Sequence, residues 1–153
     1  MKSISLDKQG IYSYQQNREP YLMIDYATEI IPGKSSAGYK DFKSDEWFFK
    51  VHWPSDPNVP GMLQIEALVQ MCALSILTLP NNKGKIVYLT SANNLKFIKK
   101  IVPNTRLYIK TNVKIVLKPF KALKRPIYRP ALTGLKDTPK GEDGRQKDMS
   151  RLT

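Results

Sequence analysis

A long apolar segment between two turn signals most constrains how this chain can fold. Residues 62–77 contain no Gly or Pro, follow directly after Pro60-Gly61 and stop before Pro80-Asn81-Asn82. This pattern predicts one α-helix that begins after the first turn and ends before the second. Because the segment is apolar on nearly every face, the helix has to be buried. A chain of 153 residues, 41% of them hydrophobic, is large enough to build one domain around it.

The other patterns predict β-strands around this helix. Residues 21–31 are rich in β-branched and aromatic residues and end at a Pro-Gly turn, and residues 36–43 can return as the hairpin partner. Residues 85–89, 95–102 and 106–117 predict three further strands. Strands around a single buried helix predict an α+β fold in which a sheet wraps around the helix.

The last segment differs in composition from the rest of the chain. Residues 118–153 hold four prolines and, from Thr133 onward, almost no apolar residues. They carry ten Lys/Arg against four Asp/Glu, so less than a quarter of the chain holds half of the net charge of +12. We expect a domain over residues 1–117 and a basic, Pro-rich tail over residues 118–153. The tail is expected to be irregular, partly disordered or at best a fraying edge strand, which leaves the sheet incomplete at its C-terminal strands.

Composition also excludes several classes of protein and site. Gln64, Glu66, Gln70 and Ser75 interrupt the most apolar run, so no membrane span of about 18 residues is expected. The N-terminus lacks an apolar h-region, which makes the cytoplasm the expected compartment. With one histidine and one cysteine, a zinc site is not expected. Cys72 lies among apolar residues, which favours a buried thiol over a nucleophile.

Chemistry-bearing residues concentrate between residues 45 and 70. His52 is the only histidine, and Glu66 is a carboxylate in an otherwise apolar helix, where it must be paired, neutralised or turned toward a wet cavity. Gln70, four residues later on the same helical face, can hold Glu66 by a hydrogen bond. The unpaired N–H groups at the start of the helix, beside Gly61, can polarise a carbonyl oxygen. Singly, each residue also fits a structural role, but together they suit proton chemistry next to a carbonyl.

The string over residues 45–70 carries a resemblance. It reads Asp-Glu-Trp-Phe-Phe-Lys-Val-His-Trp-Pro-Ser-Asp-Pro-Asn-Val-Pro-Gly-Met-Leu-Gln-Ile-Glu-Ala-Leu-Val-Gln. It resembles the signature of the (3R)-hydroxyacyl-acyl-carrier-protein dehydratases, a hotdog-fold family of fatty acid synthesis, including the spacing from His52 to Glu66. Residues 20–25, 32–34 and 96–103 are similar to further segments of that family. The resemblance covers about residues 15 to 115.

The chain departs from the family pattern at several positions. Val51 replaces the glycine before the histidine, Ser55-Asp56 replaces the glycine after it, and Asn104-Thr105 stands where the family usually has Gly-Asp. A valine at position 51 is strained if the family's glycine uses a positive φ. Where the family has two long hydrophobic strands that complete the sheet, this chain has residues 118–153.

The resemblance implies a fold and a mechanism. The fold is a hotdog, an antiparallel sheet wrapped around a long central helix, in which two protomers place His52 of one subunit opposite Glu66 of the other. The assembly is then a dimer or a trimer of dimers. His52 removes the α-proton of a 3-hydroxyacyl thioester, the Gly61 N–H polarises the carbonyl, and Glu66, held by Gln70, protonates the departing hydroxyl. The products are a trans-2-enoyl thioester and water.

The resemblance also implies a substrate carrier and no cofactor. The substrate is carried on the phosphopantetheine arm of acyl carrier protein, and the reaction requires no metal or redox cofactor. The acyl chain is expected in an apolar tunnel lined by Phe49, Trp53, Leu63 and Phe97. Acyl carrier proteins are strongly acidic, and a basic rim would attract one through Lys96, Lys99, Lys100 and Arg106.

Three other functions stay open. A hotdog acyl thioesterase hydrolyses the thioester, usually with a carboxylate acting on water, and needs no histidine at position 52. A non-catalytic hotdog homologue folds but does not turn over substrate. The net charge of +12 also suits nucleic acid, but the chain has no recognisable nucleic-acid module, so nucleic acid is not an expected partner. Binding through the basic tail would be lost when residues 118–153 are deleted.

Overall fold

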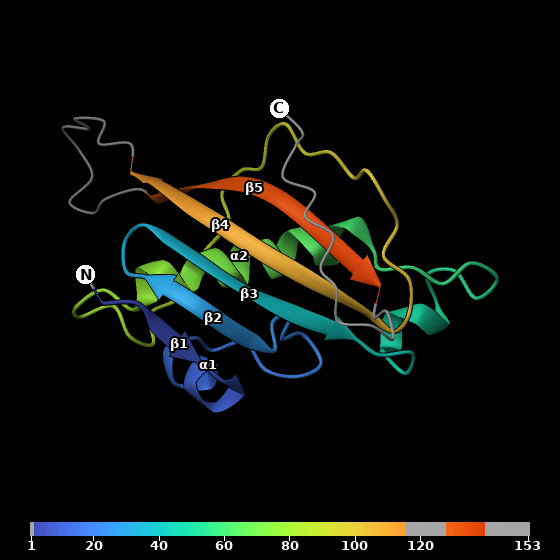
Figure 1. Cartoon of the computed structure of the whole chain (residues 1–153), viewed down its shortest axis with the longest axis horizontal. Helices are drawn as coiled ribbons and strands as arrows, with labels where there is room; N and C mark the ends of the chain where they lie inside the picture. The colour runs from blue at the N-terminus through green and yellow to red at the C-terminus, as the bar shows by residue number, and fades with distance from the viewer. Residues whose placement is uncertain (1, 116–127, 140–153) are drawn as a thin grey trace.

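The computed structural model describes residues 2–115 and 128–139 of the chain. In chain order the elements are β1 (Ile4–Leu6), α1 (Lys8–Tyr14), β2 (Tyr26–Ile31), β3 (Ser35–Phe42), the 3-10 helix η1 (Trp47–Lys50), α2 (Gly61–Leu77), β4 (Thr105–Ile115) and β5 (Tyr128–Pro139). Within these residues the strands form one antiparallel sheet in the order β1-β2-β3-β4-β5. Helix α2 lies along one face of this sheet (Figure 1). This is the predicted α+β arrangement of a sheet around one helix.

Helix α2 is the centre of the core, as the sequence predicts. It begins at Gly61, ends at Leu77, and buries every residue except Gly61, Met62 and Glu66. Met62 belongs to the first turn, so Glu66 is the one residue of the later turns that is not buried. No helix in the described ranges is long and apolar enough to cross a membrane.

Strand β3 packs closely against α2 because its residues alternate between the two faces of the sheet. Ser36, on the buried face, donates its hydroxyl to the Met71 carbonyl oxygen over 2.5 Å. At Gly38 a side chain has no room. A Cβ there would lie 2.6 Å from the Met71 Cε and would collide with the carbonyl oxygen of Tyr26 on β2. The glycine therefore lets β2, β3 and α2 approach one another.

The strands predicted over residues 85–89 and 95–102 are absent, and this prediction was wrong. The segment has no regular secondary structure, and Ile86, Tyr88 and Ile98 are 60%, 78% and 80% exposed. β-Propensity reflects the fit of a side chain to neighbouring strands and a core rather than an intrinsic backbone preference. Among the described residues, no strand pairs with this segment.

Two other differences from the sequence expectations have local causes. The predicted strand over residues 21–31 begins only at Tyr26, because the Tyr21 carbonyl and the Met23 N–H are bound by the Gln70 side chain instead of a neighbouring strand. Helix α1 was not predicted, although Asp7 caps it by accepting from the Gly10 N–H over 2.8 Å.

Part of the predicted basic tail lies within the described residues. Residues 128–139 form β5, which pairs with β4 along the end of the sheet and places Pro130 opposite Val113. A proline is tolerated on an outer strand, where its missing N–H can face away from the ladder. Residues 118–127 and 140–153 lie outside the described part of the chain, and the division at residue 117 stays a prediction.

Gln15 is a buried side chain whose replacement is expected to stabilise the fold. It is 4% exposed, and its amide oxygen and nitrogen find no hydrogen-bond partner within the described residues. Gln15→Leu keeps the volume and removes the unpaired amide, so the free energy of unfolding should rise by about 1–3 kcal/mol. Chemical denaturation measures this change. Gln16→Leu is the matched control, because Gln16 is exposed and donates to the Gly84 carbonyl oxygen. A loss of stability in Gln15→Leu would contradict the prediction.

Candidate active site

His52 follows η1, and the backbone of that turn fixes its position. The His52 N–H donates to the Phe48 carbonyl oxygen over 2.8 Å, and the His52 carbonyl oxygen accepts from the Asn58 N–H over 3.3 Å. The imidazole stacks on the Trp53 ring with 4.2 Å between the ring centroids. The imidazole is therefore held by main-chain contacts on both sides of the residue and by one aromatic neighbour.

The hydrogen bond of the imidazole selects its tautomer. Nδ1 lies 3.3 Å from the Asn58 carbonyl oxygen, which can only accept. In the neutral ring Nδ1 must therefore carry the hydrogen, which leaves the lone pair on Nε2. Asn58 is itself held, since its side-chain amide donates to the Asp56 carbonyl oxygen over 2.8 Å. This arrangement leaves the lone pair on Nε2, which makes no hydrogen bond to the part of the chain that the structure describes.

Glu66 projects from α2 into a polar setting. Its Oε1 accepts from Gln70 Nε2 over 2.8 Å, as the four-residue spacing predicts, and lies 3.5 Å from Asn17 Nδ2. The Gln70 amide also donates to the Tyr21 carbonyl oxygen and accepts from the Met23 N–H, both over 2.8 Å. Because all these bonds fix the amide, Gln70 holds the Glu66 carboxyl in one orientation.

The N-terminus of α2 lies against an aromatic ring. A Cβ on Gly61 would lie 2.9 Å from the Phe97 Cζ, so the absence of a side chain lets this ring approach the helix. Gln64 secures the first turn by donating its side-chain amide to the Val59 carbonyl oxygen over 3.0 Å. The structure therefore brings together Gly61 and Phe97, two residues that the sequence singled out for different roles.

Comparison with known proteins identifies the family. The family model of the FabA-like domain matches residues 16–137, which is most of the chain. The chain belongs to this family. The 3-hydroxyacyl-[acyl-carrier-protein] dehydratase FabZ of Clostridium novyi (strain NT) is 41% identical over 107 residues, which cover 68% of this chain and 75% of the relative. The protein of the same name from Clostridium botulinum (strain Hall) is 45% identical over 98 residues, 64% of this chain and 68% of the relative.

Family membership confirms the predicted resemblance and the hotdog fold. Two departures from the family pattern fit the backbone. Val51, in place of a glycine, has φ −126° and ψ −19°, so it needs no left-handed conformation. Asn104, in place of another glycine, has φ 60°, a conformation that asparagine adopts more readily than most residues. Its side-chain oxygen accepts from the Ser44 N–H over 3.2 Å.

Two residues beside Glu66 were missed by the sequence analysis. Asn17 contacts the carboxyl directly. Partial burial, and then the Glu66 charge, raise the pKa of the Tyr21 phenol, which places Tyr21 within electrostatic reach of the site. Both residues lie between α1 and β2, far from residues 45–70 in the sequence. No spacing rule connects them to the motif, and only the fold brings them to α2.

The four residues expected to line the acyl tunnel divide into two pairs. Phe49 and Leu63 are buried in the core, at 5% and 7% exposure, whereas Trp53 and Phe97 are 58% and 50% exposed. Phe97 lies at Gly61 and Trp53 lies at His52. The exposed pair is thus next to candidate catalytic groups, and the tunnel itself stays a prediction.

The four residues of the expected basic rim differ in their pairing. Arg106 makes a bidentate contact of 2.7 Å with both Asp41 oxygens, and Lys100 pairs with Asp56 at 2.6 Å. Lys96 and Lys99 are exposed and make no ion pair among the described residues. Of these four residues, Lys96 and Lys99 therefore carry positive charge that no carboxylate of the described residues pairs with.

Cys72 and the acidic residues give no further site within the described ranges. Cys72 is 2% exposed, and burial raises the pKa of its thiol to about 11, which disfavours the nucleophilic thiolate. Among the described residues, no group of three or more His, Cys, Asp or Glu side chains is placed to hold a metal ion.

Proposed function

We propose that the protein is a hydro-lyase that dehydrates (3R)-3-hydroxyacyl-acyl carrier protein to trans-2-enoyl-acyl carrier protein in fatty acid biosynthesis. The observation that carries this proposal is the hydrogen bond from His52 Nδ1 to the Asn58 carbonyl oxygen, which leaves Nε2 free to accept a proton. The dehydratase names of relatives at 41% and 45% identity support the same substrate class.

In this mechanism each step uses a group of the chain. His52 Nε2 takes the α-proton, and the electrons of the broken C–H bond form the new double bond. The Gly61 N–H, at the positive end of the α2 dipole, stabilises the negative charge that develops on the thioester oxygen. Glu66, in its carboxylic acid form, donates a proton to the β-hydroxyl, which leaves as water. One proton is removed from the substrate and one is donated to the departing hydroxyl, and no electrons pass to another molecule. The step therefore needs no redox partner.

A second subunit completes the proposed site. Within one chain, no hydrogen bond or ion pair joins His52 to Glu66 among the described residues. We infer a dimer in which His52 of one protomer faces the Glu66 of its partner. Further assembly of dimers into a trimer of dimers, and a cytoplasmic location, stay predictions.

Product analysis with a crotonyl thioester of acyl carrier protein tests the reaction. The dehydratase running in reverse hydrates the double bond and gives a 3-hydroxybutyryl thioester. A thioesterase would release free crotonic acid instead, and a non-catalytic homologue would return the substrate unchanged. Either of these two outcomes would refute the proposed function. Size-exclusion chromatography with light scattering on the same sample tests the dimer.

Carrier-protein binding is expected to weaken as salt rises. Lys96 and Lys99 are exposed and have no ion-pair partner among residues 2–115 and 128–139. Exposed charges are screened beyond about 8 Å at physiological ionic strength. Calorimetry at low and high NaCl measures the effect. The double variant Lys96→Ala/Lys99→Ala should bind more weakly and lose most of the salt dependence. Lys110→Ala, an exposed residue on β4, should bind like the wild type. An affinity indifferent to salt would contradict an electrostatic contact.

A further inference from the structure

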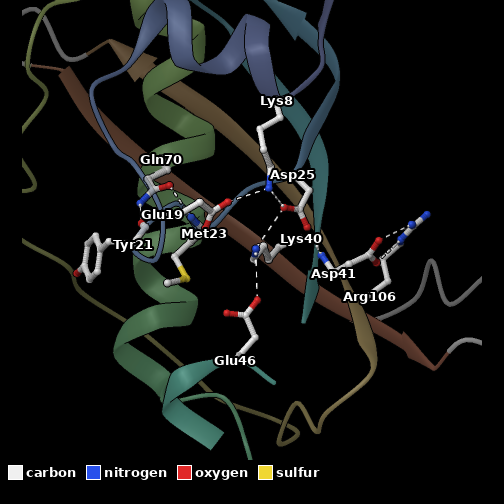
Figure 2. Close-up of polar contacts among 10 residues, drawn as sticks. All are labelled: Lys8, Glu19, Tyr21, Met23, Asp25, Lys40, Asp41, Glu46, Gln70 and Arg106. Atoms are coloured by element: carbon white, nitrogen blue, oxygen red, sulfur yellow. Dashed lines mark hydrogen bonds and ion pairs between the residues drawn. The ribbon is translucent and has the colours of Figure 1, made fainter. Parts of the chain in front are cut away.

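The side chain of Lys40 places an ammonium group on the core-facing side of β3. It is 5% exposed and lies on the same strand face as Gly38 and Phe42. A buried charge is costly unless it is paired. Lys40 Nζ lies 3.2 Å from Asp25 Oδ1 and 3.5 Å from Glu46 Oε1 (Figure 2). This cation therefore joins two segments that are far apart in the sequence.

Glu46 connects Lys40 to the segment that carries His52. It is the residue at the N-terminus of η1, and its carbonyl oxygen accepts from the Phe49 N–H over 3.1 Å. The His52 N–H donates in turn to the Phe48 carbonyl oxygen. One short helical turn separates Glu46 from His52, so the main-chain hydrogen bonds of η1 link the two residues.

Asp25 connects Lys40 to the support of Glu66. It ends the segment that begins at Tyr21, and the Gln70 amide binds the main chain of this segment while donating to Glu66. The second Asp25 oxygen accepts from the Asp41 N–H over 2.8 Å, which ties the carboxylate to β3. Figure 2 shows the Lys40 ammonium group between Asp25 and Glu46, with the Gln70 contacts to Tyr21 and Met23 to one side of it.

We propose that Lys40 is a positioning residue for both candidate catalytic groups. It touches neither of them but fixes the main chain beside His52 through Glu46 and the main chain beside Gln70 and Glu66 through Asp25. Lys8 also reaches Asp25, at 3.3 Å, but its side chain is 41% exposed and it makes no ion pair with Glu46 among the described residues. The kinetic part of this inference rests on the proposed dehydratase function, whereas its geometric part does not.

Glu46→Gln tests the contact toward His52, because it keeps the shape of the side chain and removes the charge that pairs with Lys40. We expect kcat to fall about tenfold to a hundredfold while KM changes little, since misplacement of a catalytic group by about 1 Å has an effect of this size. Glu19→Gln is the matched control. Glu19 pairs with Lys8 at 2.8 Å, is 47% exposed and makes no hydrogen bond or ion pair with Lys40 or η1 within the described residues.

The single histidine supplies a second measurement that does not depend on activity. The imidazole Cε1–H NMR resonance can come only from His52. It should shift or broaden in Glu46→Gln and stay in place in Glu19→Gln. An unmoved resonance in folded Glu46→Gln, or an unchanged kcat in an active enzyme, would overturn the positioning role. If the wild-type protein has no dehydratase activity but the His52 resonance still moves in Glu46→Gln, the proposed function is refuted and the positioning role is supported.

A double variant keeps the test decisive if Glu46→Gln does not fold. Lys40→Met/Glu46→Gln removes both charges together, which avoids leaving a buried ammonium group short of a partner. The same kinetic and NMR measurements apply to it, with the same expected changes. A double variant that retains both the wild-type kcat and the wild-type His52 resonance would overturn the proposal.

Discussion

Replacement of His52 by alanine is expected to lower kcat for hydration of a crotonyl thioester by about 10²- to 10⁴-fold, the contribution typical of one general acid–base group. The bond from Nδ1 to Asn58 leaves Nε2 as the only basic imidazole nitrogen. Glu66→Gln should have a similar effect, because an amide keeps the hydrogen bond with Gln70 but cannot serve as the proton donor. Steady-state kinetics on purified variants measure both changes.

A neighbouring residue provides the control for this experiment. Lys50 is exposed and lies in η1, two residues before His52, so Lys50→Ala should retain full activity. The thermal unfolding midpoint of His52→Ala should stay close to that of the wild type, because the side chain is partly exposed and makes one hydrogen bond. Undiminished activity in His52→Ala and in Glu66→Gln would refute the mechanism.

A mixture of the two inactive variants tests whether the site is shared between subunits. If His52 and Glu66 of different protomers form each site, a mixed dimer of His52→Ala and Glu66→Gln holds one intact site. Random reassociation makes half of the dimers mixed, so refolding the variants together should recover about a quarter of the wild-type activity. No recovery from well-folded mixed dimers would place both groups in the same protomer.

Gly38→Ala is expected to destabilise the protein by about 3 kcal/mol or more, at the upper end of the cost of overpacking a core. The added methyl group meets the Tyr26 carbonyl oxygen and the Met71 Cε. A carbonyl that takes part in the sheet cannot rotate away as the end of a flexible side chain could. Relief of the collision therefore requires β2 and β3 to separate, which weakens the pairing of both strands.

Chemical denaturation at a fixed protein concentration measures the effect of Gly38→Ala, because oligomer stability depends on concentration. Ala37→Val is the control. Ala37 precedes Gly38 on β3 but lies on the opposite face of the sheet, where added apolar volume should have a small effect. A Gly38→Ala variant as stable as the wild type would show that β2 or α2 can move to accommodate the methyl group.

The sequence predicted the parts of the fold in which pattern and environment agree. The helix over residues 61–77 and the strand over residues 35–42 lie within one residue of their expected bounds. The helix is apolar on nearly every face and is buried on nearly every face. The strand was predicted from its place after a Pro-Gly turn, because its buried face carries Ser36, Gly38, Lys40 and Phe42 and has no apolar period. The segment over residues 85–102 has the composition of strands but no partner among the described residues, and composition alone cannot reveal the absence of a partner.

The candidate site was predictable only where its residues share one motif. The spacing within residues 45–70 singled out His52, Glu66, Gly61 and Gln70. Asn17, Tyr21 and Lys40 come from other segments, and tertiary folding alone brings them to the site or its supports. Lys40 had no distinguishing signal, because a lysine in an alternating strand is ordinarily assigned to the exposed face.

Both tryptophans flank the His52 segment, and this determines what intrinsic fluorescence reports. Trp47 begins η1 and Trp53 stacks on the imidazole, and the two side chains are 46% and 58% exposed. Their emission therefore follows the local order of this segment, whereas far-ultraviolet circular dichroism follows α2 and the sheet. Coincident melting by the two probes would mean that the segment and the core unfold as one cooperative unit. An earlier fluorescence transition would mean that the candidate catalytic segment loosens before the core.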